Sequence, residues 1–80
     1  MTRDELQARL VELLTGVAPD VDPAALLPGV PFRDQFDFDS MDTLNFAVAI
    51  HDALGIDVPE TDYAKLASLD GCVDYLQPRL

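Results

Sequence analysis

The stretch FDFDSMD, residues 36–42, gathers three carboxylates and one hydroxyl within seven residues. Its single serine, Ser40, lies among Asp37, Asp39 and Asp42. A hydroxyl in this setting could cap a helix, help to bind a metal, act as a nucleophile or accept a covalently attached group. The residues around Ser40 bear on each of these four roles.

Helix capping is the commonest role for a serine at the start of a helix. Asp39 precedes Ser40 and caps at least as well, because its carboxylate accepts hydrogen bonds from the first backbone N–H groups. With Asp39 as the cap, Ser40 takes the first helical position and keeps its hydroxyl free. Asp39 and Asp42 also offset the positive end of the helix dipole. Capping therefore explains Asp39 better than it explains Ser40.

Calcium binding does not fit the spacing of these residues. Asp37 and Asp39 match the first two ligand positions of an EF-hand loop. The third ligand position, however, is Met41, the glycine position is Asp42, and the closing glutamate position is Val48. The sequence therefore predicts no metal site.

Nucleophilic catalysis fails because a catalytic serine needs an adjacent base. His51 is the only histidine, and on one helix it would lie roughly 16 Å from Ser40 at about 1.5 Å per residue. We expect His51 to be an ordinary exposed residue or a minor docking contact. The protein is therefore predicted not to be an enzyme, and covalent attachment remains as the role of Ser40.

Hydrophobic periodicity predicts an all-α fold, a small four-helix bundle of three longer helices and one short helix. Thr2 and Glu5 predict a capping box at the first helix, which should end near Gly16, ahead of a proline. Gly55 should end the second helix and Pro78 the last. The helices are expected at residues 2–17, 40–55, 60–67 and 68–77, with an extended link at 56–59.

A long loop is expected between the first two helices, over residues 18–39. Asp22 and Pro23 predict one short helical turn inside it. A structureless loop of this length would be unusual in a compact domain. We therefore expect apolar side chains to anchor it to the core, namely those of Leu26, Leu27, Val30, Phe32 and Phe36.

The second helix carries two apolar stripes when it is wound at about 100° per residue. The broader stripe, which includes Phe46 and Ile50, can form the core face. The second stripe contains Met41, Leu44 and Val48. It could either pack under the long loop or form an exposed partner site rimmed by acids.

The charge distribution favours the partner site. Fifteen acids against five bases give a net charge of −10, and eight of the acids lie between Asp34 and Asp62, where no lysine or arginine occurs. Such a field repels nucleic acid and anionic lipid and favours partners with basic docking surfaces. We expect a single domain over residues 1–80 that is monomeric and cytoplasmic, without membrane insertion. This expectation rests on the single cysteine and on the lack of both a membrane-length apolar run and a signal-like N-terminus.

The motif DSMD at 39–42, which opens an apolar helix ending in LGIDVP, resembles the acyl carrier proteins. Their usual pattern is Asp-Ser-Leu-Asp, a helix, and then Phe-Gly-Ile-x-Ile-Pro. The segments LLPGVPFRDQFDFDS and TDYAKLASLDGCVDYL extend this resemblance over nearly all of the chain. The four-residue motif alone would be weak, but its combination with Gly-Ile-x-Val-Pro at the right distance is specific.

The resemblance implies that a phosphopantetheinyl transferase moves 4′-phosphopantetheine from coenzyme A onto Ser40, and that the terminal thiol of this arm carries acyl groups as thioesters. Asp39 and Met41 would flank the site and help the transferase to recognise it. Acyl ligases or synthases and acyltransferase-type enzymes would dock through basic patches. The implied docking positions are Asp42, Leu44, Asn45, Val48, His51 and Asp52.

The resemblance also assigns core positions, which in carriers that enclose their cargo form the acyl cavity. Cys72 and Tyr75 would be core residues of the last helix, Cys72 as a small buried hydrophobe. The positions of the core or acyl cavity are Phe46, Ile50, Leu54, Ile56, Val58 and Leu66.

This chain departs from the family pattern around the serine. Asp37 and Phe38 stand where a glycine and a small residue are usual, and Asn45 and His51 stand where glutamates are common. These differences favour a specialised fatty-acid, lipid or polyketide-type pathway. One alternative is an aminoacyl or peptidyl carrier, although these tend to have Gly-Gly-x-Ser and weaker acidity. The other is an acidic helical module that binds partners without modification of Ser40.

Overall fold

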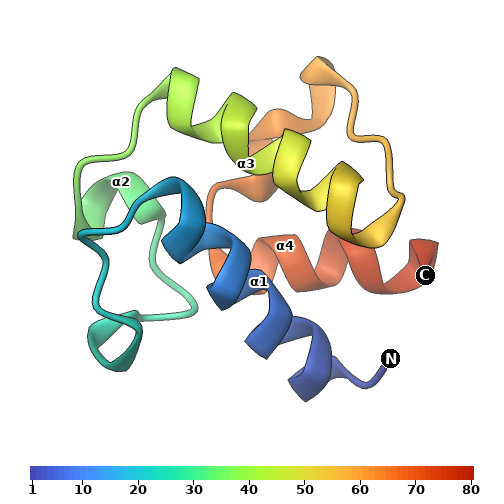
Figure 1. The fold of residues 1–80 in the computed structure, drawn as a ribbon, viewed down its shortest axis with the longest axis horizontal. Helices are drawn as coiled ribbons and strands as arrows, with labels where there is room; N and C mark the ends of the chain where they lie inside the picture. The colour runs from blue at the N-terminus through green and yellow to red at the C-terminus, as the bar shows by residue number, and fades with distance from the viewer.

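The computed structural model describes residues 1–80 and contains helices but no strands (Figure 1). This confirms the predicted all-α architecture, in which the 3₁₀ helix η2 is the short member and a further short helix, α2, lies in the long loop. The elements in chain order are α1 (Arg3–Val17), η1 (Pro23–Ala25), α2 (Phe32–Gln35), α3 (Ser40–Leu54), η2 (Glu60–Leu66), α4 (Leu69–Leu76) and η3 (Gln77–Arg79).

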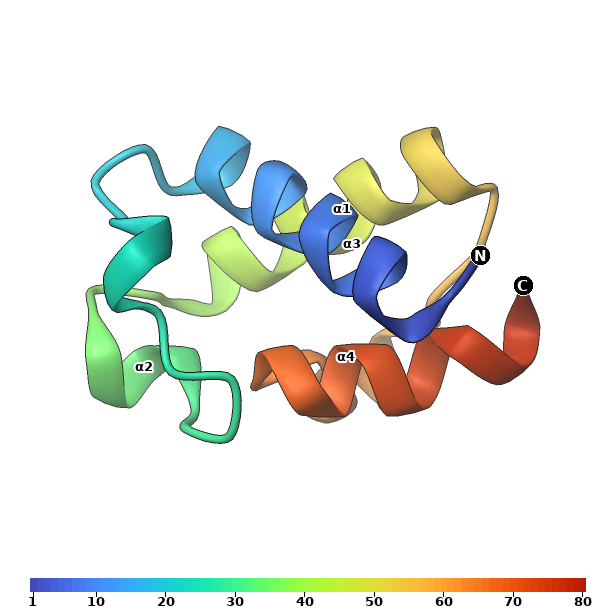
Figure 2. The ribbon, with the colours of Figure 1, turned by 90° about the horizontal axis from the view of Figure 1, so that it is seen from below.

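Helix α1 packs against both α3 and α4, and η2 packs against the same two helices. Figures 1 and 2 show the two chain ends at the same end of the molecule. There a side-chain ion pair joins Arg3 at the start of α1 to Asp74 of α4, with an N···O distance of 2.8 Å. The bundle therefore holds α3 on one side by α1 and on another by η2.

Local signals set most helix ends where the sequence predicts them. Thr2 and Glu5 form the expected capping box at α1. Gly55 ends α3 with φ +71°, a left-handed conformation that suits glycine. The last α-helix, α4, ends at Leu76, ahead of Pro78 as expected, and Pro78 lies in the short 3₁₀ helix η3 that follows it. A proline is tolerated there because the first turn of a helix needs no N–H from it.

The long loop is held by a polar side chain that the sequence analysis did not single out. Asp22 caps η1 as predicted, accepting a hydrogen bond from the Ala24 N–H at 3.0 Å. The expectation that Leu27 anchors the loop is wrong, because its side chain is 56% exposed. The side-chain amide of Gln35 instead bonds the Leu27 N–H at 2.7 Å and the Leu27 carbonyl at 2.8 Å. Polar bonds to the backbone thus do what burial of Leu27 was expected to do.

Four phenylalanines gather where the loop meets α3. Phe32 is fully buried, and its ring centroid lies 5.3 Å from that of Phe38 and 6.0 Å from that of Phe46. Phe36 completes the cluster at 5.8 Å from Phe32. The Phe32 N–H also donates to the Ala67 carbonyl at 2.8 Å, which links α2 to the end of η2. The loop before Ser40 is thereby fixed both to α3, through the phenylalanine rings, and to the end of η2, through the Phe32 N–H.

Candidate functional site

Asp39 and Asp42 form a reciprocal capping box at the start of α3. Asp39 Oδ1 accepts from the Asp42 N–H at 3.0 Å, and Asp42 Oδ2 accepts from the Asp39 N–H at 3.1 Å. Asp39 is therefore the cap, as predicted. The second bond was not predicted, although an acid three residues after a cap is the sequence signal for it. Asp42, predicted as a docking charge, also fixes the helix start.

Ser40 is the first residue of α3 and is exposed. The hydrogen bonds around it are made by its neighbours, including one from the Thr43 hydroxyl to the Asp39 carbonyl at 3.2 Å. The Ser40 hydroxyl takes part in none of the side-chain hydrogen bonds of this helix start. The capping box therefore holds the serine at a defined position and leaves its oxygen available for a new bond.

A cleft of about 450 Å³ opens beside Ser40. One wall comes from the loop and α2, another from the first turn of α3, and a third from η2. Its lining combines apolar groups with hydroxyls and charges, including Arg33, Phe38, Asp39, Ser40, Thr43 and Tyr63. Ser40 thus lies at the edge of a space that can hold an attached group.

The second apolar stripe of α3 is exposed. Met41, Leu44 and Val48 are 61%, 40% and 50% exposed, whereas Phe46 and Ile50 on the other stripe are fully buried. The stripe therefore does not pack under the long loop, which was one of the two interpretations of it. An exposed row of large apolar side chains is a feature of partner-binding surfaces.

Polar residues of α3 surround this stripe. Asn45, His51 and Asp52 are exposed, and Asp42 is partly exposed. His51 Nδ1 lies 3.7 Å from the Asp52 Oδ1. The structure therefore places every predicted docking position on α3 at least partly at the surface, where a partner could reach it.

The predicted core positions form a packed interior. Leu54 is partly buried and packs against the core. Val58 also lines a small cleft of about 120 Å³ together with Val48 and His51. The fully or largely buried members, each at most 8% exposed, are Phe46, Ile50, Ile56, Val58 and Leu66.

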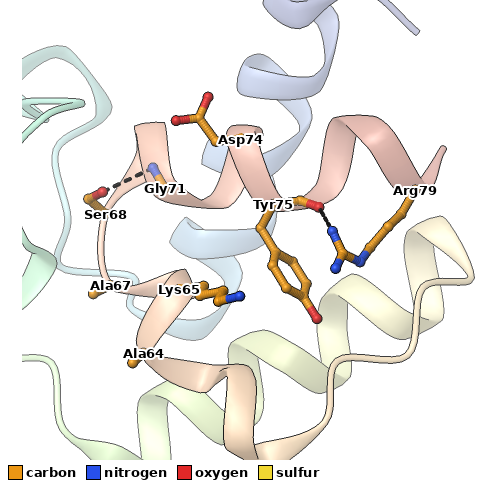
Figure 3. A pocket seen from close by; sticks show the side chains of 8 residues that line it. All are labelled: Ala64, Lys65, Ala67, Ser68, Gly71, Asp74, Tyr75 and Arg79. Atoms are coloured by element: carbon orange, nitrogen blue, oxygen red, sulfur yellow. Dashed lines mark hydrogen bonds between the residues drawn. The ribbon is translucent and has the colours of Figure 1, made fainter.

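A second cleft, of about 420 Å³, lies between η2 and α4 (Figure 3). In the view of Figure 3 the Tyr75 ring lies between Lys65 and Arg79. The Arg79 guanidinium carbon is 3.8 Å from the ring centroid, and the Lys65 ammonium is 5.6 Å away. The Tyr75 hydroxyl donates to Asp62 at 2.6 Å, and this bond is the main cause that raises the Tyr75 pKa. None of the predicted site residues lines this cleft.

Cys72 is fully buried in α4, as the sequence predicts. Burial raises the pKa of its thiol to about 12, because an apolar interior disfavours the thiolate. Such a thiol is inert at neutral pH. Cys72 therefore serves as a packing residue.

No cluster of three or more histidine, cysteine, aspartate or glutamate side chains has a geometry that could hold a metal ion. None of the helices combines the length and the apolar character needed to span a membrane. The start of α3 is the place where an exposed hydroxyl, that of Ser40, lies beside a cleft.

Comparison with known proteins identifies the family of this region. A family model described as "Phosphopantetheine attachment site" matches residues 8–76, which include Ser40, the cleft and the whole of α3. The meromycolate extension acyl carrier protein of Mycolicibacterium smegmatis is 32% identical over 76 residues, covering 95% of this chain and 76% of that protein. The acyl carrier protein of Rubrobacter xylanophilus is 26% identical over 76 residues, covering 95% of this chain and 93% of that protein.

Some relatives are considerably longer than this chain. The mitochondrial acyl carrier protein of Neurospora crassa is 28% identical over 76 residues, covering 95% of this chain but 57% of that protein. The Mycobacterium leprae meromycolate extension acyl carrier protein is 30% identical, and 66% of it is covered. Acyl carrier proteins are carriers rather than catalysts. This chain belongs to the acyl carrier protein family, whose phosphopantetheine attachment domain it matches over most of its length.

Proposed function

We propose that Ser40 is the residue to which 4′-phosphopantetheine is attached, and that the chain carries acyl groups as thioesters on that arm. The observation that carries this proposal is the state of the Ser40 hydroxyl. It is exposed at the first position of α3, outside the hydrogen bonds of the cap, and at the edge of a cleft of about 450 Å³. The match to the phosphopantetheine attachment family spans this position.

The residues around Ser40 suit this attachment. Asp39 and Asp42 hold the helix start, so the hydroxyl is presented in one place. In the loading step the Ser40 oxygen bonds to the phosphorus of coenzyme A nearest the pantetheine. The bond from that phosphorus to the bridging diphosphate oxygen breaks, and adenosine 3′,5′-bisphosphate leaves with that oxygen and the electron pair of the bond. The serine proton goes to a base of the transferase, since His51 lies about three turns away on α3. When attached, the arm supplies a terminal thiol that holds acyl groups as thioesters.

The exposed face of α3 is the proposed docking surface for the transferase and for enzymes that load or use the acyl group. Met41, Leu44 and Val48 supply apolar contact area, and Asp42 and Asp52 supply negative charge. A basic patch on a partner would be drawn to this helix by the acidic field and would then bury the stripe. Charge steers the encounter, and apolar burial holds the complex.

Asn45 and His51 are proposed to select among partner enzymes, because both are exposed beside the stripe and neither carries the negative charge usual at these positions. On this ground we propose a specialised fatty-acid, lipid or polyketide-type pathway. The chain would act there as a monomer in the cytoplasm. If a fatty-acid ketosynthase turned over this protein and a housekeeping carrier equally well, the specialised role would be rejected.

The attachment is tested by intact mass. The purified protein is incubated with coenzyme A and a broad-specificity phosphopantetheinyl transferase, and the expected result is a mass gain of one phosphopantetheinyl group. Ser40→Ala should abolish the gain. Thr43→Ala is the matched control, because Thr43 lines the same cleft and carries the nearest other hydroxyl on α3, and its mass gain should be unchanged. A gain that survives in Ser40→Ala would reject Ser40 as the site.

A non-covalent module is the second candidate, favoured by the exposed stripe alone. It predicts that Ser40→Ala keeps full function with its partners, whereas the carrier predicts complete loss of acyl transfer. Binding of Ser40→Ala to a partner enzyme, measured beside acyl transfer, separates the two functions. A variant that binds and still supports turnover would favour the module.

A further inference from the structure

Arg33 is the one arginine whose guanidinium is not engaged by the protein. Of the four arginines in the sequence, Arg3 and Arg9 form ion pairs with N···O distances of 2.8 and 2.9 Å. Arg79 stacks on an aromatic ring at 3.8 Å and donates to a carbonyl of α4. Arg33 takes part in no ion pair and no side-chain hydrogen bond, although Asp34 follows it directly. Its charge is therefore available to a ligand.

Arg33 and Ser40 line the same cleft. Arg33 comes from α2, and it is the only basic residue in the lining. Asp39 is the one acid of the lining, and its Oδ1 already accepts the hydrogen bond of the helix cap. An arginine without an ion pair and the serine proposed for modification thus line one cleft.

Attachment of the arm at Ser40 places a new negative charge in this cleft. The charge is a phosphodiester, which stays ionised at neutral pH, and it arrives in a chain that already carries a net charge of −10. Asp39 and Asp42 stand within the same turn of α3, so their carboxylates repel it. The N–H groups of the helix start offset part of this repulsion, but Asp39 and Asp42 already occupy some of them.

We propose that the guanidinium of Arg33 binds the phosphodiester oxygens through which the arm is attached to Ser40. This inference rests on the proposed function. The phosphorus is bonded directly to the Ser40 oxygen, so it stays at the cleft even when the far end of the arm swings away. An arginine suits this role because its planar fork donates two parallel hydrogen bonds to phosphate oxygens. Arg33 thereby acts as a positioning residue that fixes the root of the arm against α2.

The experiment compares unmodified and fully loaded protein for four forms: wild type, Arg33→Gln, Arg33→Lys and Arg9→Gln. Arg9→Gln is the matched control, because it removes the same charge from an exposed arginine that pairs only with Glu12 on α1. Intact mass confirms complete loading of each form. Thermal unfolding then gives the change in Tm caused by loading, and ¹⁵N NMR follows the Nε–H signal of Arg33 in wild type.

Loading is expected to lower Tm more, or raise it less, in Arg33→Gln than in wild type. The expected difference is about 1 to 8 °C, the range for an exposed ion pair in a domain of this size. Arg9→Gln should follow wild type, and Arg33→Lys should recover part of the difference. The Nε–H signal of Arg33 should shift on loading, and coenzyme A added to unloaded Ser40→Ala protein should not shift it.

Three results would overturn the inference. The first is an equal effect of loading on Tm in wild type and Arg33→Gln. The second is an equal loss in Arg9→Gln, which would show a general charge effect. The third is a shift of the Arg33 signal by free coenzyme A in Ser40→Ala, which would show anion binding unrelated to the attached arm. If wild type gains no mass at all, the proposed function fails and this inference fails with it, whereas loading without coupling rejects only the role of Arg33.

Discussion

Replacing Asp39 separates two tasks that this one side chain performs. Its Oδ1 accepts the hydrogen bond of the Asp42 N–H at 3.0 Å, and its negative charge lies next to Ser40. Asp39→Ala removes both the acceptor and the charge. Asp39→Asn removes the charge but keeps an oxygen that can cap, since asparagine and aspartate are similarly good caps.

The structure gives the expected size of each effect. Loss of a side-chain cap costs about 1 kcal/mol in the free energy of unfolding, within a range of about 0.5–2 kcal/mol. For a domain of this size about 1 kcal/mol corresponds to a change in Tm of about 4–8 °C. Asp39→Ala should therefore melt about 4–8 °C below wild type. Asp39→Asn should lose less than half of that, because only the interaction of its charge with the helix dipole is gone.

Two assays read these variants. Thermal unfolding followed by circular dichroism measures the cap, and the rate of mass gain with coenzyme A and a transferase measures recognition. We expect both variants to be loaded more slowly than wild type, because a basic transferase is steered by the charge beside Ser40. Asp39→Asn is the informative case, since it should melt near wild type and still load slowly.

The effect on stability and the effect on loading can each be refuted separately. If Asp39→Ala melts within about 1 °C of wild type, the capping box contributes much less than the roughly 1 kcal/mol expected of a side-chain cap. If Asp39→Asn is loaded at the wild-type rate, the transferase does not use the charge of Asp39.

Three further outcomes are expected. Val48→Lys should leave Tm nearly unchanged, because Val48 is 50% exposed. It should weaken binding to a basic partner enzyme, as measured by calorimetry, and an unchanged affinity would show that this face of α3 is not the docking surface. Phe32→Ala should lower the free energy of unfolding, measured in urea titrations, by about 3–5 kcal/mol, because Phe32 is fully buried. Leu27→Ala should change it by less than about 0.5 kcal/mol, because Leu27 is exposed. Similar losses in both variants would contradict the anchoring of the loop through Phe32. Because burial raises the Cys72 pKa to about 12, the thiol of the unfolded chain loses its proton first as pH rises. Between about pH 9 and 12 Cys72 should therefore lower the free energy of unfolding by at most about 1.4 kcal/mol per pH unit. Cys72→Ala should flatten this part of the profile of unfolding free energy against pH, and an unchanged slope would exclude the thiol as its cause.

Features that depend on neighbouring residues could be predicted from the sequence. The capping box of Thr2 and Glu5, the cap at Asp39 and the end of α3 at Gly55 all agree with expectation. Each depends on groups within a few positions along the chain, where covalent geometry already brings donors and acceptors together. The position of Ser40 as the first residue of α3 follows from the same local rule. The hydrogen bond from the Asp39 N–H to Asp42 could have been predicted in the same way, but Asp42 was expected to supply only charge.

Features that depend on packing between distant segments could not be predicted. Periodicity showed that Met41, Leu44 and Val48 form a stripe, but a stripe looks the same in sequence whether or not another segment covers it. For the same reason the exposure of Leu27 and the bonding role of Gln35 in the loop were not anticipated.

The sequence by itself determined the helices and the acidic field, because these follow from local geometry and composition, and its motif is the basis on which we propose Ser40 as the modified residue. Only the tertiary structure decided that the stripe of α3 is exposed and that Arg33 of α2 shares a cleft with Ser40 and with η2. Those facts require three segments to meet, and their meeting is fixed by the burial of Phe32 and its neighbours rather than by any local preference.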